Sequence, residues 1–285
     1  MTKSYFLSII VLAILTINVS HADIEIKSPE GGSITFSQEK KEAHYENNSW
    51  GKIVFSRNAY TADLSRSDRY YIENGSSKPS PSGKYLIVTS VSGGYVEFGD
   101  GVKKYTDKAY CSVVDMTNGC IVSDWDGEAC GYIWVGNKDV LASSGDVNAD
   151  KFDFQSMRPM INKTIDDFSG IDEREAANML RCDSPSKENI NAYQRMAKEN
   201  KKVKGIVLEY ISGYLSSITE KSNVTTKSNL FTLPNDNNKT SAYLVPGDKV
   251  RIIQKSSDNK WVNIGYINKE GSPLISWVKA ETLNQ

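Results

Sequence analysis

Histidine is scarce in this chain, with only 2 residues among 285. Only His44 lies beyond the first 22 residues, in a polar stretch (42–46), and we interpret it as a surface residue. Serine and cysteine nucleophiles need a histidine base within hydrogen-bond reach. The sequence also contains no Gly-x-Ser-x-Gly, Walker loop, dinucleotide fingerprint or His-Glu-x-x-His motif. We therefore expect no enzyme of these classes and no cofactor.

An excess of charge of one sign is also missing. Lys and Arg number 34, Asp and Glu number 35, and the formal net charge is -1. A nucleic-acid-binding protein presents a basic surface, so we expect no nucleic-acid partner. The hydrophobic content of 39% and charged content of 24% are typical of a folded globular protein. The length of the chain favours about two domains.

Long hydrophobic runs are absent except at the very start. Lys3 precedes an apolar run (5–19), and Ser20, His21 and Ala22 follow it. A positive start, a short apolar core and small residues at the end predict a signal peptide at 1–22, cleaved after Ala22. The run is short for a membrane span, which needs about 20 residues. We expect a periplasmic or secreted protein with no stable membrane anchor after cleavage.

Only four cysteines are present, Cys111, Cys120, Cys130 and Cys182. An even number in a secreted chain favours two disulfides over free thiols. Zinc sites use closely spaced ligand pairs, which these spacings do not provide, so we expect no metal.

The pairing of these cysteines is open among three alternatives. Thr117, Asn118 and Gly119 predict a tight hairpin turn between strands at 110–115 and 120–123. A turn centred on Asn118 and Gly119 places Cys111 about 20 Å from Cys120, which disfavours that bond. Cys120 and Cys130 lie symmetrically about Trp125. We therefore favour Cys120–Cys130, with Cys111–Cys182 joining a helix to the sheet.

The segment from Asp23 to about Arg158 has the pattern of β-strands separated by turns. Alternating or short apolar stretches mark the expected strands, which are 24–26, 33–36, 52–55, 85–89, 95–98, 110–115, 120–123 and 132–135. We expect a mainly β fold, with a β-sandwich or open-sheet domain at 23–218.

Helices interrupt this pattern between Asp166 and Asn200. Helix formers with acids in the first turn predict a helix near 171–181, and Ser184-Pro185 opens a second one at 185–199. We expect these two helices to brace the β-domain. The β-branched segment 206–211 favours a strand, with a helix as the alternative, and the polar segment 219–229 is the expected linker.

Residues 223–285 carry a recognisable order of motifs. Gly247-Asp248-Lys249-Val250 is a turn leading into a strand, and two tryptophan strands follow, with Trp261-Val262 and Trp277-Val278. This order resembles that of bacterial SH3-like domains, which implies a small β-barrel. Ser276 stands where the family has a glycine, and Leu233-Pro234 stands where many members have an Arg-x-Gly-Pro segment.

Many members of that family bind cell-wall peptide or another protein, and many are accessory modules. The aromatic residues available to line a binding groove here are Tyr243, Trp261, Tyr266 and Trp277. We interpret Trp261 and Trp277 chiefly as core and groove-wall residues, because buried aromatics dominate small cores. Tyr243 directly precedes the 244–247 turn, so we expect it to be exposed and to act as a contact residue.

These observations predict a non-enzymatic extracytoplasmic binding protein with an SH3-like module. Within that class we favour a protein partner in the bacterial periplasm and a role as inhibitor or immunity factor against a cell-envelope toxin. The alternative is a peptidoglycan-associated accessory protein that binds cell-wall peptide. A third hypothesis is a carboxylate-based wall hydrolase using Asp124, Asp126 and Glu128, although acids two apart on a turn seldom converge on a substrate.

Overall fold

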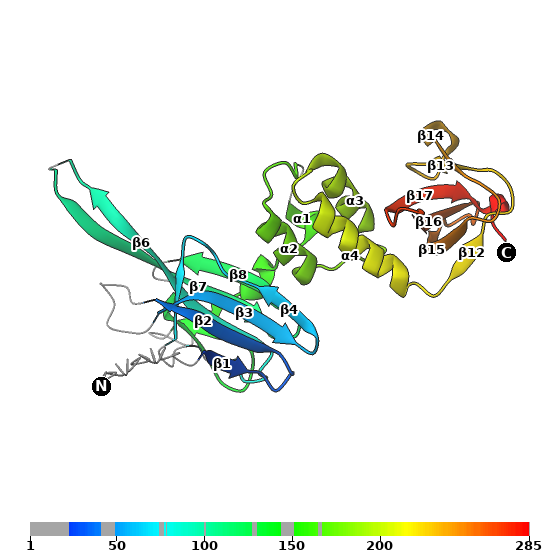
Figure 1. Cartoon of the computed structure of the whole chain (residues 1–285). Coiled ribbons are helices and arrows are strands. Elements are labelled where there is room, and N and C mark those ends of the chain that lie inside the picture. Colours follow the sequence, from blue (N-terminus) through cyan, green and yellow to red (C-terminus); the bar gives the residue numbers. More distant parts are fainter. Residues whose placement is uncertain are drawn as a thin grey trace, which may run out of the picture.

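The computed structural model describes residues 23–40, 49–73, 77, 79–99, 101–126, 130–143, 151–164 and 167–284. The predicted signal peptide and His44 lie outside these residues. The fold is mainly β, as expected, with antiparallel sheets at both ends of the described chain and helices between them (Figure 1).

The first sheet has eight strands in the order β1-β2-β3-β5-β6-β7-β8, and β4 pairs with β3. The strands are β1 (Ile24–Lys27), β2 (Ser33–Lys40), β3 (Ser49–Arg57), β4 (Tyr60–Asp63), β5 (Tyr70–Ile72), β6 (Tyr85–Glu97), β7 (Lys103–Asp115) and β8 (Cys120–Asp126). Alternate residues such as Ile34 and Phe36 are fully buried on one face. The hairpin turn predicted at 117–119 is confirmed between β7 and β8, which residues 116–119 connect.

This sheet curls, so that strands distant in its order meet. Arg57 at the end of β3 donates a hydrogen bond of 2.8 Å from Nη1 to the carbonyl oxygen of Thr117, in the β7–β8 turn. The core between β2, β3, β6 and β7 includes Phe55, Leu86 and Val114. The curl therefore lets a single sheet enclose much of its own apolar face.

Strands β6 and β7 extend well beyond the sheet as a two-stranded ribbon (Figure 1). β5 pairs with β6 only as far as Val91, and β8 pairs with β7 only from Tyr110. We call the ribbon beyond these points (residues 92–99 and 101–109) the finger. The sequence predicted a separate strand at 95–98, whereas β6 runs continuously through it to Glu97.

A second, three-stranded sheet covers the base of β7 and β8. It comprises β9 (Tyr132–Trp134), β10 (Leu141–Ser143) and β11 (Lys151–Phe152), followed by the short helix η2 (Phe154–Met157). Aromatic rings fill the space between the two sheets. Trp125, for example, lies 4.6 Å from Phe152 between ring centroids.

Four α-helices follow, α1 (Ile161–Thr164), α2 (Glu173–Cys182), α3 (Ile190–Glu199) and α4 (Lys204–Ser217). Asp172 and Glu175 form a capping box at the start of α2, consistent with the acids seen in the sequence. The strand favoured at 206–211 was wrong, because this segment belongs to α4. Val207, Ile211 and Leu215 recur every fourth residue and are all buried in the helical core.

The structure forms two disulfides, Cys111–Cys130 and Cys120–Cys182, so the favoured pairing was wrong. β8 continues straight through Trp125 to Asp126, and no loop centred on Trp125 brings Cys120 to Cys130. Cys111 is instead opposite Trp125 in the sheet register, near the end of β8 that leads to Cys130. A disulfide does join a helix to the sheet, but through Cys120.

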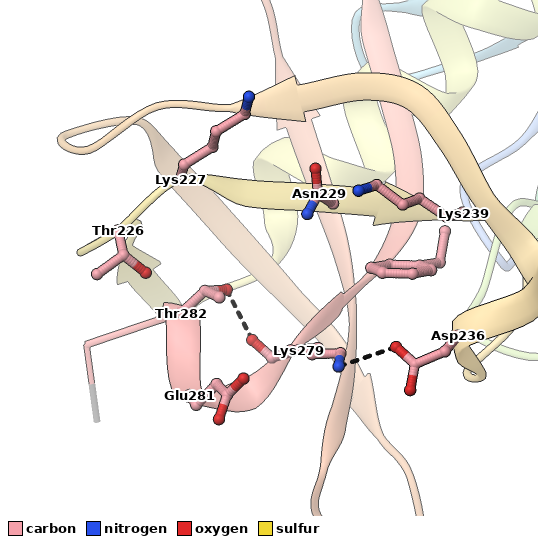
Figure 2. Close-up of a pocket in the computed structure, with 9 residues that line it drawn as sticks. Thr226, Lys227, Asn229, Asp236, Lys239, Lys279, Glu281 and Thr282 are labelled. Atoms are coloured by element: carbon pink, nitrogen blue, oxygen red, sulfur yellow. Dashed lines mark hydrogen bonds and ion pairs between the residues drawn. The ribbon is translucent and has the colours of Figure 1, made fainter.

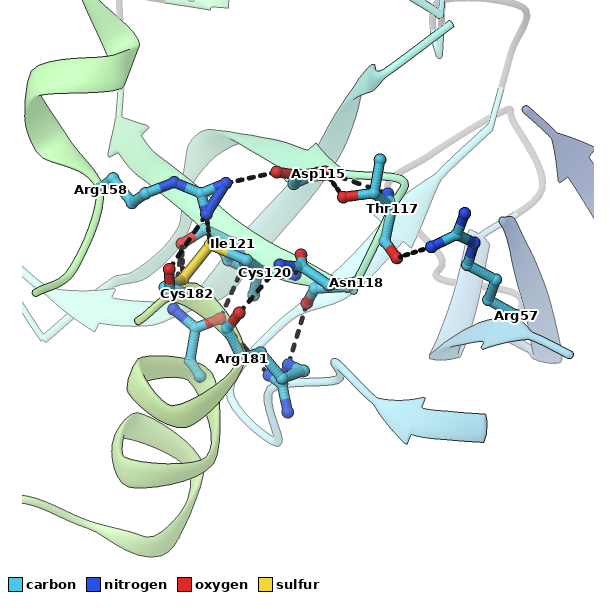
Figure 3. Close-up of polar contacts among 11 residues, drawn as sticks. Arg57, Asp115, Thr117, Asn118, Cys120, Ile121, Arg158, Arg181 and Cys182 are labelled. Atoms are coloured by element: carbon cyan, nitrogen blue, oxygen red, sulfur yellow. Dashed lines mark hydrogen bonds and ion pairs between the residues drawn. A yellow bond between two sulfur atoms is a disulfide. The ribbon is translucent and has the colours of Figure 1, made fainter. Parts of the chain in front are cut away.

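Hydrogen bonds surround this helix-to-sheet disulfide (Figure 3). Asn178 of α2 accepts from the Ile121 backbone N–H at 2.8 Å and donates to its carbonyl at 3.0 Å. Arg181 donates to the carbonyl of Gly119 at 3.0 Å. Arg158 pairs with the buried Asp115. These contacts hold α2 firmly against the start of β8.

The last sheet has six strands in the order β12-β15-β16-β17-β13-β14. They are β12 (Lys221–Asn223), β13 (Ser228–Phe231), β14 (Lys239–Leu244), β15 (Lys249–Lys255), β16 (Trp261–Ile267) and β17 (Pro273–Lys279), with the short helices η3 (Asp236–Asn238) and η4 (Ala280–Thr282). The expected linker 219–229 was wrong in part, because it supplies β12 and the buried Val224 to this unit.

In the described part of the chain, no helix is both long and apolar enough to cross a membrane.

Candidate functional site

The C-terminal sheet has two faces with different roles. Leu230, Leu244, Val262, Ile264 and Val278 alternate onto one face and form its apolar core, together with Val224, Val250, Ile252 and Leu283. The residues between them, which include Phe231, Trp261 and Trp277, lie on the opposite face. This second face carries the candidate site.

Helix α4 covers one end of the second face. Gly265 of β16 lies so close to α4 that a Cβ atom there would be 2.2 Å from Cδ2 of the buried Leu215. Ile275 of β17 belongs to the helical core, and Gln194 of α3 donates a hydrogen bond of 3.1 Å to its carbonyl. The other end of the face, around Phe231, is not covered by this helix.

The four predicted binding aromatics do not form one groove. Trp261 is buried and lies edge-on to Phe231, with ring centroids 4.8 Å apart, as expected for a core residue. Trp277 is half-buried on the same face. Tyr266 packs on the opposite, core-facing side and donates a hydrogen bond of 3.4 Å to Asp248. Tyr243 is 52% exposed, which confirms its expected exposure.

A pocket of about 570 Å³ opens around Phe231, at the uncovered end of this face (Figure 2). Its wall combines three lysines, two acids, three small polar residues and one aromatic ring, from segments far apart in the chain. They are Thr226, Lys227, Asn229, Phe231, Asp236, Lys239, Lys279, Glu281 and Thr282. The pocket is therefore mainly polar, with the ring of Phe231 as its apolar part.

The three lysines of the pocket differ in their partners. Lys279 donates to Asp236 at 2.8 Å, and this hydrogen bond raises the pKa of the Lys279 ammonium. Lys227 holds its ammonium 4.2 Å from the ring centroid of Tyr243. Neither Lys227 nor Lys239 has an ion pair with any residue that the structure describes. Two cations of the pocket thus have no ion pair among the described residues, and one of them, Lys227, lies over the exposed ring of Tyr243.

Such an arrangement suits recognition of a negatively charged, partly apolar group. Lysine ammonium groups supply charge and rotatable donors, and Asn229 adds an amide that both donates and accepts. Tyrosine provides contact area with a polar end, a property common in binding surfaces. Glu281 and Asp236 lower the net positive charge of the pocket.

Asp124, the described member of the predicted carboxylate cluster, lies in a second pocket of about 290 Å³ between the first sheet and α2. It accepts hydrogen bonds of 2.9 Å from both Arg69 and Ser112. The side chain of Asp126 and all of Glu128 lie outside the described residues. The structure therefore places Asp124 in an ion pair with Arg69.

The finger also carries exposed apolar side chains. Tyr95, Val96, Phe98 and Val102 lie towards its end, and Phe98 is 61% exposed. Near the base, the Tyr105 ring lies over Gly93, where a Cβ would be 2.1 Å from its hydroxyl oxygen. This hydroxyl is also 3.4 Å from that of Tyr70, which holds the ribbon against the sheet.

The sequence drew attention to the aromatic residues and missed Lys227, Lys239 and Asn229. Lys227 lies in the segment interpreted as a linker, so its polar neighbours masked it. Comparisons of the chain with family models, with curated proteins and with solved structures found no match.

Proposed function

We propose that this chain is a non-enzymatic periplasmic or secreted protein that binds a protein partner, as an inhibitor or immunity factor. The pocket around Phe231 is the observation that carries this proposal, because two of its lysines have no ion pair among the described residues and one of them, Lys227, lies over the exposed Tyr243. The order of motifs in 223–285 supports the further proposal that the C-terminal unit is an SH3-like module.

The compartment is part of the same proposal. Two disulfides fit an oxidising environment, and the apolar run at 5–19 supports export.

Cell-wall peptide is the second candidate ligand, because SH3-like domains of bacteria include wall-binding members. The finger favours a protein partner instead. Its end presents Phe98, Val96 and Val102 to solvent, and such apolar side chains find little to contact on a polar glycopeptide. A carboxylate-based hydrolase is the least supported function, because Asp124 is held by Arg69.

The test compares binding of the full mature chain to purified sacculi and to secreted proteins encoded beside its gene. The site variant is Lys227→Glu/Lys239→Glu. The matched control is Lys202→Glu/Lys269→Glu, which makes the same change of charge at exposed positions, in the helical unit and at the β16–β17 turn. Melting curves verify that both variants fold.

We expect a soluble protein to be bound by the wild type and the control, and at least about tenfold more weakly by the site variant. Retention on sacculi that depends on Lys227 and Lys239 would establish the wall-binding function instead. Equal binding by both variants would show that this pocket is not the recognition site.

A further inference from the structure

We propose that the outer edge of β14 binds an extended acidic peptide as an additional β-strand. This inference rests on the proposed binding function of the C-terminal unit and specifies its ligand and binding mode. β14 is the last strand in the sheet order, and its only strand partner among the described residues is β13. A strand at the edge of a sheet presents backbone donors and acceptors that another chain can pair with.

The backbone groups of β14 alternate between its paired side and its outer edge. The N–H of Ala242 lies on the paired side, because it donates at 3.2 Å to the Thr240 hydroxyl, which in turn donates at 3.0 Å to the Leu230 carbonyl of β13. The N–H groups of Ser241 and Tyr243 alternate with that of Ala242 and therefore point to the outer edge. An incoming strand can accept from these N–H groups at small cost, because a hydrogen bond to water is exchanged for one to a carbonyl.

The charges beside the edge select an acidic ligand. Lys239 starts β14, and Lys227 lies over Tyr243 near its end. Side chains at every second position of an added strand share one face and repeat about every 7 Å. Acidic residues at alternate positions would therefore follow the row formed by Lys239 and Lys227, with Tyr243 providing apolar contact.

The same charges argue against a second copy of the chain as the occupant. Two copies paired along β14 would bring their lysines together, and lysine at a sheet edge is a common protection against self-association. Two exposed apolar residues, Leu233 before β14 and Val245 just after it, favour a peptide that also carries apolar side chains. An acidic segment alternating with apolar residues meets both requirements.

The test uses three hexapeptides with blocked ends and the full mature chain. The first is Glu-Val-Glu-Val-Glu-Val, which is acidic and forms strands. The second is Lys-Val-Lys-Val-Lys-Val, which reverses the charge. The third is Glu-Pro-Glu-Pro-Glu-Pro, which keeps the acidic charge but cannot donate ladder hydrogen bonds from its prolines. Affinity is measured by titration, and backbone protection is measured by hydrogen exchange with mass spectrometry.

We expect the Glu-Val peptide to bind at least about tenfold more tightly than the other two. Amides in 239–245 should then exchange at least about tenfold more slowly, with little change in the finger. Equal binding of the Glu-Pro peptide, or binding without protection of β14, would overturn strand addition. Absence of binding by the Glu-Val peptide would overturn it as well.

Two variants complete the test. Ser241→Pro removes an N–H that points to the outer edge of β14, at an edge position where proline is tolerated. Lys239→Glu reverses one exposed charge and leaves the backbone unchanged, so it remains informative if the proline variant unfolds. Each should weaken binding of the Glu-Val peptide about tenfold. If neither does so while Lys227→Glu/Lys239→Glu still abolishes partner binding, strand addition fails and the proposed function stands.

Discussion

Removing each disulfide in turn should lower the free energy of unfolding by a different amount. In the chain-entropy relation, a cross-link stabilises more when it joins residues further apart in the sequence. Cys120–Cys182 has a sequence separation of 62, and Cys111–Cys130 one of 19. The relation gives losses of about 4 and about 3 kcal/mol, respectively. We therefore expect Cys120→Ser/Cys182→Ser to be the less stable variant, by about 1 kcal/mol.

Urea unfolding of both double variants under non-reducing conditions measures this difference. Peptide mapping of the wild type tests the pairing independently. A protease that cleaves before aspartate separates Cys111, Cys120 and Cys130, because Asp115 and Asp124 lie between them. A peptide linking Cys120 to Cys130 would refute the pairing. A greater loss of stability on removing Cys111–Cys130 would refute the energetic reasoning.

Three further predictions concern packing, a buried amide and pH. Gly265→Ala should lower the free energy of unfolding by about 1–3 kcal/mol, because the added methyl group crowds Leu215. Gly213→Ala, at an open position of α4, should raise it by about 0.5–1 kcal/mol. Thermal melts of the two variants test these opposite shifts. Asn263 is fully buried, and its side-chain amide has no hydrogen-bond partner among the described residues. Asn263→Val should therefore raise the free energy of unfolding, measured in urea, by about 1–2 kcal/mol. A lower free energy of unfolding would show that the amide is hydrogen-bonded. Burial raises the pKa of Tyr71 from its ordinary value of 10.0 to about 12, so the phenol ionises at lower pH in the unfolded chain and stability should fall as pH rises from 10 towards 12. Measured by urea unfolding at several pH values, this fall should be smaller in Tyr71→Phe, and an equal fall in the variant would contradict the assignment.

The sequence by itself predicted those elements whose signal lies in their own few residues. Alternation at 33–36 predicted part of β2, because a half-buried strand needs side chains on two different faces. The acids at the start of α2 indicated its first turn, and Asn118 with Gly119 indicated the β7–β8 turn. In each case the signal lies within a few residues and does not depend on the rest of the fold.

Tertiary packing decided what the local signals left ambiguous. The segment 206–211 is β-branched, yet it is helical because Val207, Ile211 and Leu215 fill the core formed by the other helices. The burial gained by that face outweighs the weak strand preference of single residues. The finger likewise depends on pairing between β6 and β7 along their full lengths, which no local pattern specifies.

The disulfides and the candidate site depended entirely on long-range geometry. The cysteines alone predicted two disulfides, but only the register of β7 and β8 decided which sulfur atoms meet. Exposure of Tyr243 followed from its place before a turn, whereas the pocket around Phe231 needs Lys227, Lys239 and Lys279 together. Lys227 directly precedes β13, Lys239 begins β14 and Lys279 ends β17. The three meet because β13 pairs with both β14 and β17. Such pairing is set by the packing of the whole sheet, so the sequence could supply the residues but not their arrangement.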